Sequence, residues 1–204
     1  MIHPDTEVRY INDKIGYGVI ATKFIPKGTI TWALDKLDRE FTPEKINSME
    51  KVYQDILDKF TYRNNKGNFI LCWDIARFVN HSFNSNCIIT AYEFEIAVRE
   101  IFPGEELTDD YGYLNVTEPF DCVPEKGSIR KRVLPDDLLN YRQEWDIKLE
   151  DAFHFYNKVE QPLDMFLDKE IRHKATAIAL GKKKMDSILT CFFRQDKVVK
   201  LFSH

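Results

Sequence analysis

The sequence has few cysteines, little net charge and no long apolar run, and each shortage argues against a class of protein. None of its four cysteines stands in C-x-x-C spacing, which argues against a zinc ribbon and a disulfide framework and favours a reduced, intracellular setting. They are Cys72, Cys87, Cys122 and Cys191. The formal net charge is −4, so no broad basic field indicates sequence-independent binding to nucleic acid.

Membrane and secretory signals are missing as well. No stretch of about eighteen apolar residues exists, and the sequence therefore predicts no transmembrane helix. The N-terminal residues lack a basic segment followed by an apolar one, so no secretory signal peptide is expected. These absences predict a soluble intracellular protein without membrane contact, and they leave cytoplasm and nucleus open.

The chain does have enough apolar material for a real core. It is 204 residues long, 44% hydrophobic and 13% aromatic, which suits one compact domain with an appendage or two small domains. Short β-branched runs bounded by Gly and Pro predict strands within residues 8–34, 69–73 and 88–99. Helical spacing of apolar residues predicts a core-packing helix after Thr42-Pro43.

The C-terminal third has a different character. Its first part contains turn residues, Pro119, Pro124, Gly127 and Pro135, which are typical of a linker. Two helices are then expected, at 136–156 and at 162–193, with Gly181 as a break in the second.

Three stretches contain small or polar residues in patterns that are weak alone. Residues 16–21 read G-Y-G-V-I-A, residues 76–87 read A-R-F-V-N-H-S-F-N-S-N-C, and residues 97–112 read A-V-R-E-I-F-P-G-E-E-L-T-D-D-Y-G. A glycine pair is ordinarily a tight hairpin, and Asn and Ser ordinarily form loops. The order of the three stretches along the chain is informative, whereas each stretch alone is not.

Taken together, the three stretches resemble the SET-domain family of protein-lysine methyltransferases, which reads roughly G-x-G, R-F-x-N-H-S-C-x-P-N and G-E-E-L-x-x-D-Y. The resemblance covers about residues 8–117. It implies a mainly β SET fold of several small sheets with a knot-like crossing. The implied organisation is a SET domain at 1–118 with a helical insert at about 35–66, a linker or post-SET-like segment at 119–135, and an α-helical extension at 136–204.

The resemblance also implies an activity, which is S-adenosylmethionine-dependent transfer of a methyl group to a deprotonated lysine of a histone or another protein. Tyr111 matches the terminal tyrosine, whose hydroxyl orients the reacting groups. The residues implied to hold S-adenosylmethionine are Gly16, Tyr17, Gly18, Asn80, His81 and Tyr111. No metal site is expected.

Departures from the family pattern are informative. Phe83 stands where the family has a zinc-binding cysteine, and only Cys122 follows the terminal tyrosine closely, so no zinc post-SET module is expected. Asp109 stands where many members have Phe or Tyr. Its carboxylate either attracts the substrate ammonium or points away from the lysine channel, with Ile89 or Tyr92 filling the space. The number of methyl groups transferred stays open.

Three further hypotheses concern packing. Arg77 and Glu106 are expected to form a largely buried ion pair. The segment 113–122, with Phe120 at its centre, is expected to fold back as the wall of the lysine channel, because a water-filled channel would restore the usual pKa of lysine. The aromatic residues of the extension pack either as a small helical subdomain or as a dimer interface.

Two other functions compete with the methyltransferase. A SET fold that binds a peptide or partner without transferring methyl groups finds its best support in Asp109. A hydrolase that uses Ser82, His81 and Asp110 lacks the G-x-S-x-G turn, and adjacent His and Ser side chains on an extended segment point apart.

Overall fold

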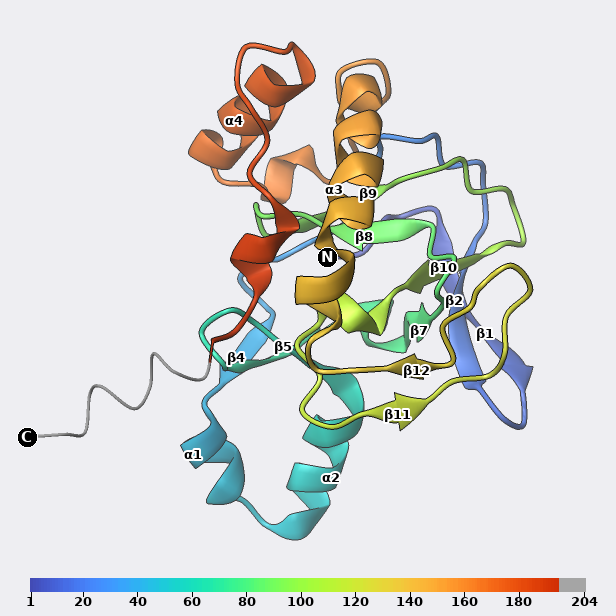
Figure 1. Ribbon diagram of the computed structural model, residues 1–204, viewed down its shortest axis with the longest axis vertical. Coiled ribbons are helices and arrows are strands. Elements are labelled where there is room, and N and C mark those ends of the chain that lie inside the picture. Colours follow the sequence, from blue (N-terminus) through green and yellow to red (C-terminus); the bar gives the residue numbers. More distant parts are fainter. Residues whose placement is uncertain (195–204) are drawn as a thin grey trace, which may run out of the picture.

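Four small β-sheets carry the first two thirds of the chain in the computed structural model, which describes residues 1–194 (Figure 1). Their strand orders are β1-β2-β10-β7, β3-β9-β8, β4-β6-β5 and the pair β11-β12. The strands are β1 Thr6–Asn12, β2 Gly16–Ala21, β3 Ile30–Ala33, β4 Arg39–Phe41, β5 Thr61–Arg63, β6 Phe69–Leu71, β7 Asn80–His81, β8 Cys87–Ile89, β9 Phe94–Ala97, β10 Glu106–Asp109, β11 Phe120–Asp121 and β12 Arg132–Val133.

Helices lie at opposite ends of the sheets (Figure 1). The α-helices are α1 Pro43–Asn47, α2 Lys51–Phe60, α3 Asp137–Tyr156 and α4 Lys169–Ala179, and short 3-10 helices span Ile75–Phe78, Tyr111–Tyr113, Asp164–Phe166 and Ile188–Cys191. None of the helices in residues 1–194 has the length and apolar composition that crossing a membrane requires. The predicted architecture, mainly β with a helical insert and a helical C-terminal extension, is confirmed.

The helical insert differs from its prediction in two respects. Thr42 caps α1 by accepting a hydrogen bond from the Lys45 amide at 3.2 Å, as expected, but the helix ends after five residues and α2 begins at Lys51. The apolar stripe of α2 is mostly exposed, with Leu57 buried and Tyr53 54% exposed. The expectation that this stripe packs into the core is therefore wrong for most of its residues.

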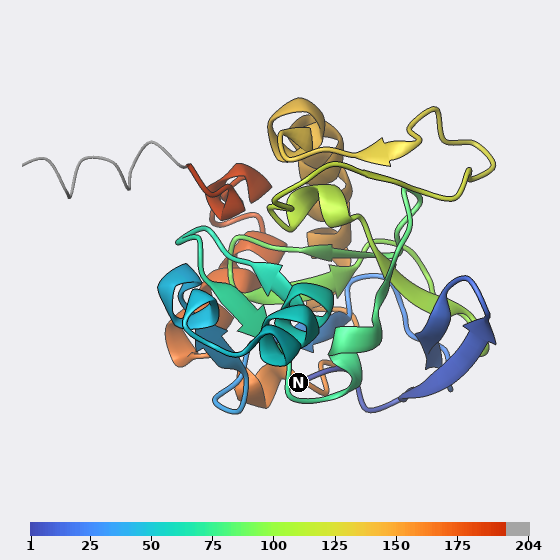
Figure 2. The ribbon, with the colours of Figure 1, turned by 90° about the horizontal axis from the view of Figure 1, so that it is seen from below.

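Two segments far apart in the sequence meet at the centre of the molecule (Figure 2). Strand β7 runs parallel to β10, with Asn80 opposite Thr108 and His81 opposite Asp109. The Asn86 side chain joins the following loop to β10, donating to the Glu106 carbonyl at 2.7 Å and accepting from the Thr108 amide at 2.9 Å. These bonds satisfy backbone groups at the crossing and fix its register.

The C-terminal helices extend the core of the sheets. Helix α3 buries Trp145, Leu149 and Phe153, which belong to the same buried cluster as the strands. The Trp145 ring packs edge-on against Tyr113 at 5.3 Å between centroids. The helix predicted at 136–156 is confirmed, whereas only Lys169–Ala179 of the second predicted helix is α-helical. The last ten residues of the predicted extension, 195–204, lie outside the described residues.

Candidate active site

Tyr111 sits where β10 turns into a short 3-10 helix. The Asp110 side chain caps this turn by accepting a hydrogen bond from the Gly112 amide at 3.0 Å. The Tyr111 hydroxyl donates to the Val79 carbonyl at 2.7 Å, which ties the ring to the residue before β7. Burial raises the pKa of the Tyr111 phenol, so the hydroxyl stays protonated and acts as a donor rather than a base.

His81 contacts Tyr111 directly. Its Nδ1 accepts a hydrogen bond from the Tyr111 amide at 3.2 Å, and this assigns the ring proton to Nε2. Burial lowers the pKa of His81 to about 4, so the imidazole is neutral. Nε2 is buried without a hydrogen-bond partner in the described residues. The site therefore contains a buried donor that no protein group in this part of the chain satisfies.

The Asn80 amide links the glycine pair to β10. Its Nδ2 donates to the Tyr17 carbonyl at 2.9 Å and to Glu106 Oε1 at 2.7 Å. A Cβ on Gly18 would collide with the same Glu106 oxygen, so a side chain at this position would displace the Glu106 carboxylate. Gly16 has a different requirement, a φ of +83°, and open space lies around it.

The predicted Arg77–Glu106 ion pair is wrong. The Arg77 guanidinium donates to the Trp73 carbonyl at 2.8 Å and lies over the Phe78 ring. Glu106 instead accepts from Asn80, as described above. The exposed position of Arg77 on its 3-10 turn keeps its charge hydrated, which removes the need for a buried partner.

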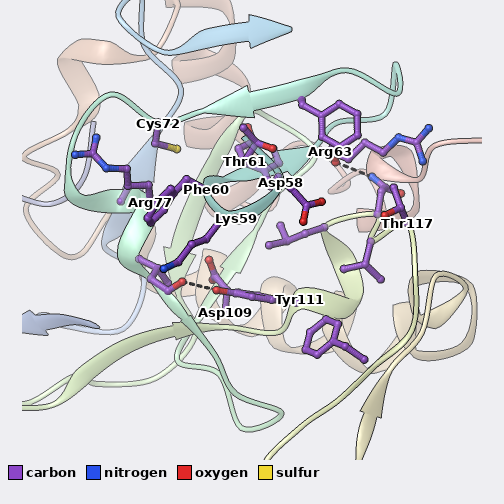
Figure 3. Close-up of a pocket in the computed structure, with 18 of the residues that line it drawn as sticks. Asp58, Lys59, Phe60, Thr61, Arg63, Cys72, Arg77, Asp109, Tyr111 and Thr117 are labelled. Carbon is purple, nitrogen blue, oxygen red and sulfur yellow. Dashed lines mark hydrogen bonds between the residues drawn. The ribbon is translucent and has the colours of Figure 1, made fainter. Parts of the chain in front are cut away.

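A cavity of about 380 Å³ lies on one side of Tyr111 (Figure 3). Of the six residues predicted to hold the cofactor, Tyr111 alone lines it, so the cavity is separate from the glycine pair and from Asn80 and His81. Its walls come from the end of α2, from β5 and from the segment 114–120. Asp109 lies next to Tyr111 in it.

Part of the segment after the 3-10 turn lines this cavity, and its role as the wall of a lysine channel stays a prediction. Residues 114–118 and Phe120 line it. The Phe120 ring lies 6.2 Å from the Tyr111 ring and 6.1 Å from the His81 ring, measured between centroids. The rings of Phe120 and Tyr111 are thus neighbours in the lining of the cavity.

A family model for the SET domain matches residues 16–112, the stretch that contains the glycine pair, the crossing and Tyr111. This chain carries a SET domain. SET domains are typical of protein-lysine methyltransferases. No curated protein matches the chain.

Beyond the matched residues, a hairpin formed by β11 and β12 is attached to the SET domain by two side chains that sequence reasoning missed. Glu125 accepts hydrogen bonds from the Ser82 hydroxyl at 2.8 Å and from the Phe83 amide at 3.2 Å. Arg130 forms ion pairs with Asp110 and with Asp137 at the start of α3. Nothing in their local sequence distinguishes these two residues from other charged loop residues.

Arg130 occupies a closely packed position. Its guanidinium lies 4.4 Å from the Phe83 ring centroid and 4.3 Å from that of Tyr141, and only 12% of its side chain is exposed. Phe83, the residue that replaces the family's zinc-binding cysteine, therefore packs against a cation. No group of His, Cys, Asp or Glu within residues 1–194 could hold a metal ion.

Asp109, an acidic residue of the SET domain, lines the cavity. Asp109 is 4% exposed and accepts a hydrogen bond from the Tyr113 hydroxyl at 2.8 Å. Asp109 lines the cavity and neither Ile89 nor Tyr92 does, so neither of these two fills its place; attraction of a substrate ammonium stays a prediction. A second acid that sequence reasoning missed, Glu95 of β9, also lines the cavity and is hydrogen-bonded to Asp109.

Burial sets the protonation of these two acids. It raises the pKa of Asp109 to about 7 and that of Glu95 well above its usual value. Two interacting carboxyl groups titrate as a pair, and the raised pKa of both favours a proton shared between them. Side chains alternate between the two faces of a strand, which indicates the face on which Glu95 lies. No local pattern in the sequence identifies Asp109 as its partner.

Proposed function

We propose that this chain is an S-adenosylmethionine-dependent protein-lysine N-methyltransferase. The observation that carries the proposal is the position of Tyr111, between the crossing that holds Asn80 and His81 and a cavity with aromatic walls. Its protonated hydroxyl is fixed by the Val79 carbonyl. Fixed alignment of this kind supplies most of the acceleration in a displacement that needs no acid or metal.

The residues of the SET domain fit the cofactor. Gly16, Tyr17 and Gly18 would lie along its methionine end, Asn80 and His81 would hold its adenine, and Tyr111 would face its reactive end. Open space at Gly16 supports this assignment because it leaves room for a ligand beside the backbone, and the buried Nε2 of His81 has no protein partner in the described residues. When bound, S-adenosylmethionine supplies a methyl group on a sulfonium.

The cavity supplies the conditions that a lysine amine needs. A free lysine has a pKa near 10.4, and only about one in a thousand is neutral at physiological pH. Phe120 and Tyr111 exclude water from one side of the cavity, and desolvation disfavours the ammonium form. A lysine side chain of a histone or another protein would enter this cavity and meet the Tyr111 hydroxyl at its end.

The test has two steps. Isothermal titration calorimetry with S-adenosylmethionine measures cofactor binding, and methyl-labelled cofactor is then incubated with histones, fractionated lysates and a lysine peptide array. We expect micromolar binding and label on lysine residues. A protein that neither binds the cofactor nor labels any substrate would refute the proposal.

A SET fold that binds peptides without catalysis remains the second candidate, and the acidic groups in the cavity favour it. A carboxylate that holds an ammonium opposes its deprotonation. Cofactor binding without label transfer to any substrate would support this candidate. The hydrolase has less support, because the Ser82 hydroxyl donates to Glu125 and not to His81.

A further inference from the structure

Two acids without a cationic partner in the described residues lie at the inner end of the cavity. Glu95 and Asp109 both line the cavity, and neither forms an ion pair with any cation in residues 1–194. A buried charge without a partner is costly, and proteins ordinarily pair such a charge or bind a metal with it. The missing partner therefore points to a cationic guest.

The position of Glu95 supports this interpretation. Its strand β9 is central in the sheet β3-β9-β8, where side chains are ordinarily covered, yet Glu95 keeps partial exposure. Trp32 is its cross-strand partner on β3 and also lines the cavity. The Trp32 side chain is 2% exposed, and its indole N–H has no hydrogen-bond partner in the described residues. The inner end of the cavity thus contains carboxyl groups without a cation and an indole N–H without an acceptor in the described residues.

We infer that the Glu95–Asp109 pair is the binding site for the primary ammonium group of the substrate lysine. The inference rests on the proposed function for the identity of the substrate, and on the cavity for its chemistry. When the two carboxyl groups share one proton, the pair carries one negative charge, which matches one ammonium group. The carbon chain of the lysine would pass between Tyr111 and the aromatic wall at Phe120.

The same pair provides a route for the substrate's proton. One N–H bond of the ammonium breaks, an O–H bond forms on the Asp109 carboxylate, and the electron pair stays on the nitrogen. The product of this step is a neutral amine beside a neutral acid pair. A cavity that excludes water favours two neutral groups over an ion pair, because each ion loses its hydration. The proton returns to water when the methylated product leaves.

Isosteric variants distinguish the contributions of the two acids to ammonium binding. Glu95→Gln keeps a donor to Asp109 and leaves the charge on Asp109, so we expect it to bind an ammonium within about threefold of the unchanged protein. Asp109→Asn removes that charge while keeping an acceptor for the Tyr113 hydroxyl, and we expect binding to weaken about tenfold. The double variant should abolish saturable binding. Glu100→Gln, on an exposed residue outside the cavity, is the matched control.

The probe is n-butylammonium chloride, an analogue of the lysine side chain, and 1-butanol is its uncharged counterpart. Both are titrated without cofactor, and the amide signals of residues 109–111 are followed in two-dimensional ¹⁵N–¹H NMR spectra, which also show that each variant is folded. We expect saturable shifts with n-butylammonium only, lost in the double variant and kept in Glu100→Gln. Equal shifts with 1-butanol, or unchanged binding in the double variant, would overturn the inference.

The assay also keeps the two proposals apart. Amine binding requires neither cofactor nor methyl transfer. Label transfer without saturable amine binding would support the methyltransferase proposal and refute the ammonium site. Saturable amine binding without label transfer would support the ammonium site and refute the methyltransferase proposal.

Discussion

The crossing of β7 and β10 and the hairpin of β11 and β12 both reach the site around Tyr111, but different chemistry holds them there. Backbone pairing and the Asn80 and Asn86 amides hold the crossing. The hairpin is held by Glu125 and by one buried cation, Arg130, between Asp110 and Asp137. Many modest neutral bonds tolerate single losses, whereas the loss of one buried cation leaves two carboxylates unpaired.

The largest expected effect is at the hairpin. Arg130→Ala leaves Asp110 and Asp137 buried without a counter-ion, and the free energy of unfolding should fall by about 3–5 kcal/mol. Chemical denaturation measures this change. Arg132 of β12 pairs with Asp121 in an exposed ion pair, so Arg132→Ala is the matched control and should cost under about 1 kcal/mol. Equal losses in the two variants would contradict the role given to Arg130.

Tyr111→Phe should lower methyl transfer about a hundredfold, because misalignment of reacting groups has effects of that order. Cofactor affinity should change little, since the ring and its amide bond to His81 remain. Single-turnover label transfer and calorimetry report the two quantities separately. Near-normal turnover would show that the hydroxyl is not central.

Asn80→Ala tests the crossing. The variant removes both side-chain bonds, to the Tyr17 carbonyl and to Glu106, and should weaken cofactor binding about tenfold. Asn84 contacts the hairpin through long hydrogen bonds of 3.3 and 3.5 Å, and Asn84→Ala should leave cofactor affinity unchanged. If calorimetry finds no difference between the two variants, the loop at Asn80 does not present the cofactor contacts.

The smallest effect is expected at the cavity wall. Phe120 is 36% exposed, so Phe120→Ala should cost little stability but should admit water beside Tyr111 and lower kcat/KM for a peptide several-fold. Phe102→Ala removes a ring that is 55% exposed and lies outside the cavity, and it serves as the control. Truncations within 116–133 are unsuited to this question, because they also remove Trp145 and Phe153 from the core.

The same contrast explains what could be predicted from the sequence. Gly18 and Asn80 belong to a motif that the sequence displays, and both lie beside the Glu106 carboxylate at the crossing. Strands and the helix at 136–156 followed from periodicity and turn residues.

The remaining features depend on contacts between distant residues. Arg130 meets Asp110 across a separation of twenty residues, and Glu95 meets Asp109 from another sheet. Arg77 was assigned the wrong partner because the family pattern gives no direction for its side chain. The exposed stripe of α2 shows that helical spacing of apolar residues identifies a helix without telling what covers it.

Mass spectrometry of a protein or peptide substrate after incubation with S-adenosylmethionine is the most direct test of the methyltransferase assignment. We predict that lysine residues gain the mass of methyl groups with the unchanged chain, and that Tyr111→Phe, folded and bound to the cofactor, gives far less product in the same time. Equal product from both proteins, or cofactor bound tightly with no lysine modified on any substrate, would contradict it.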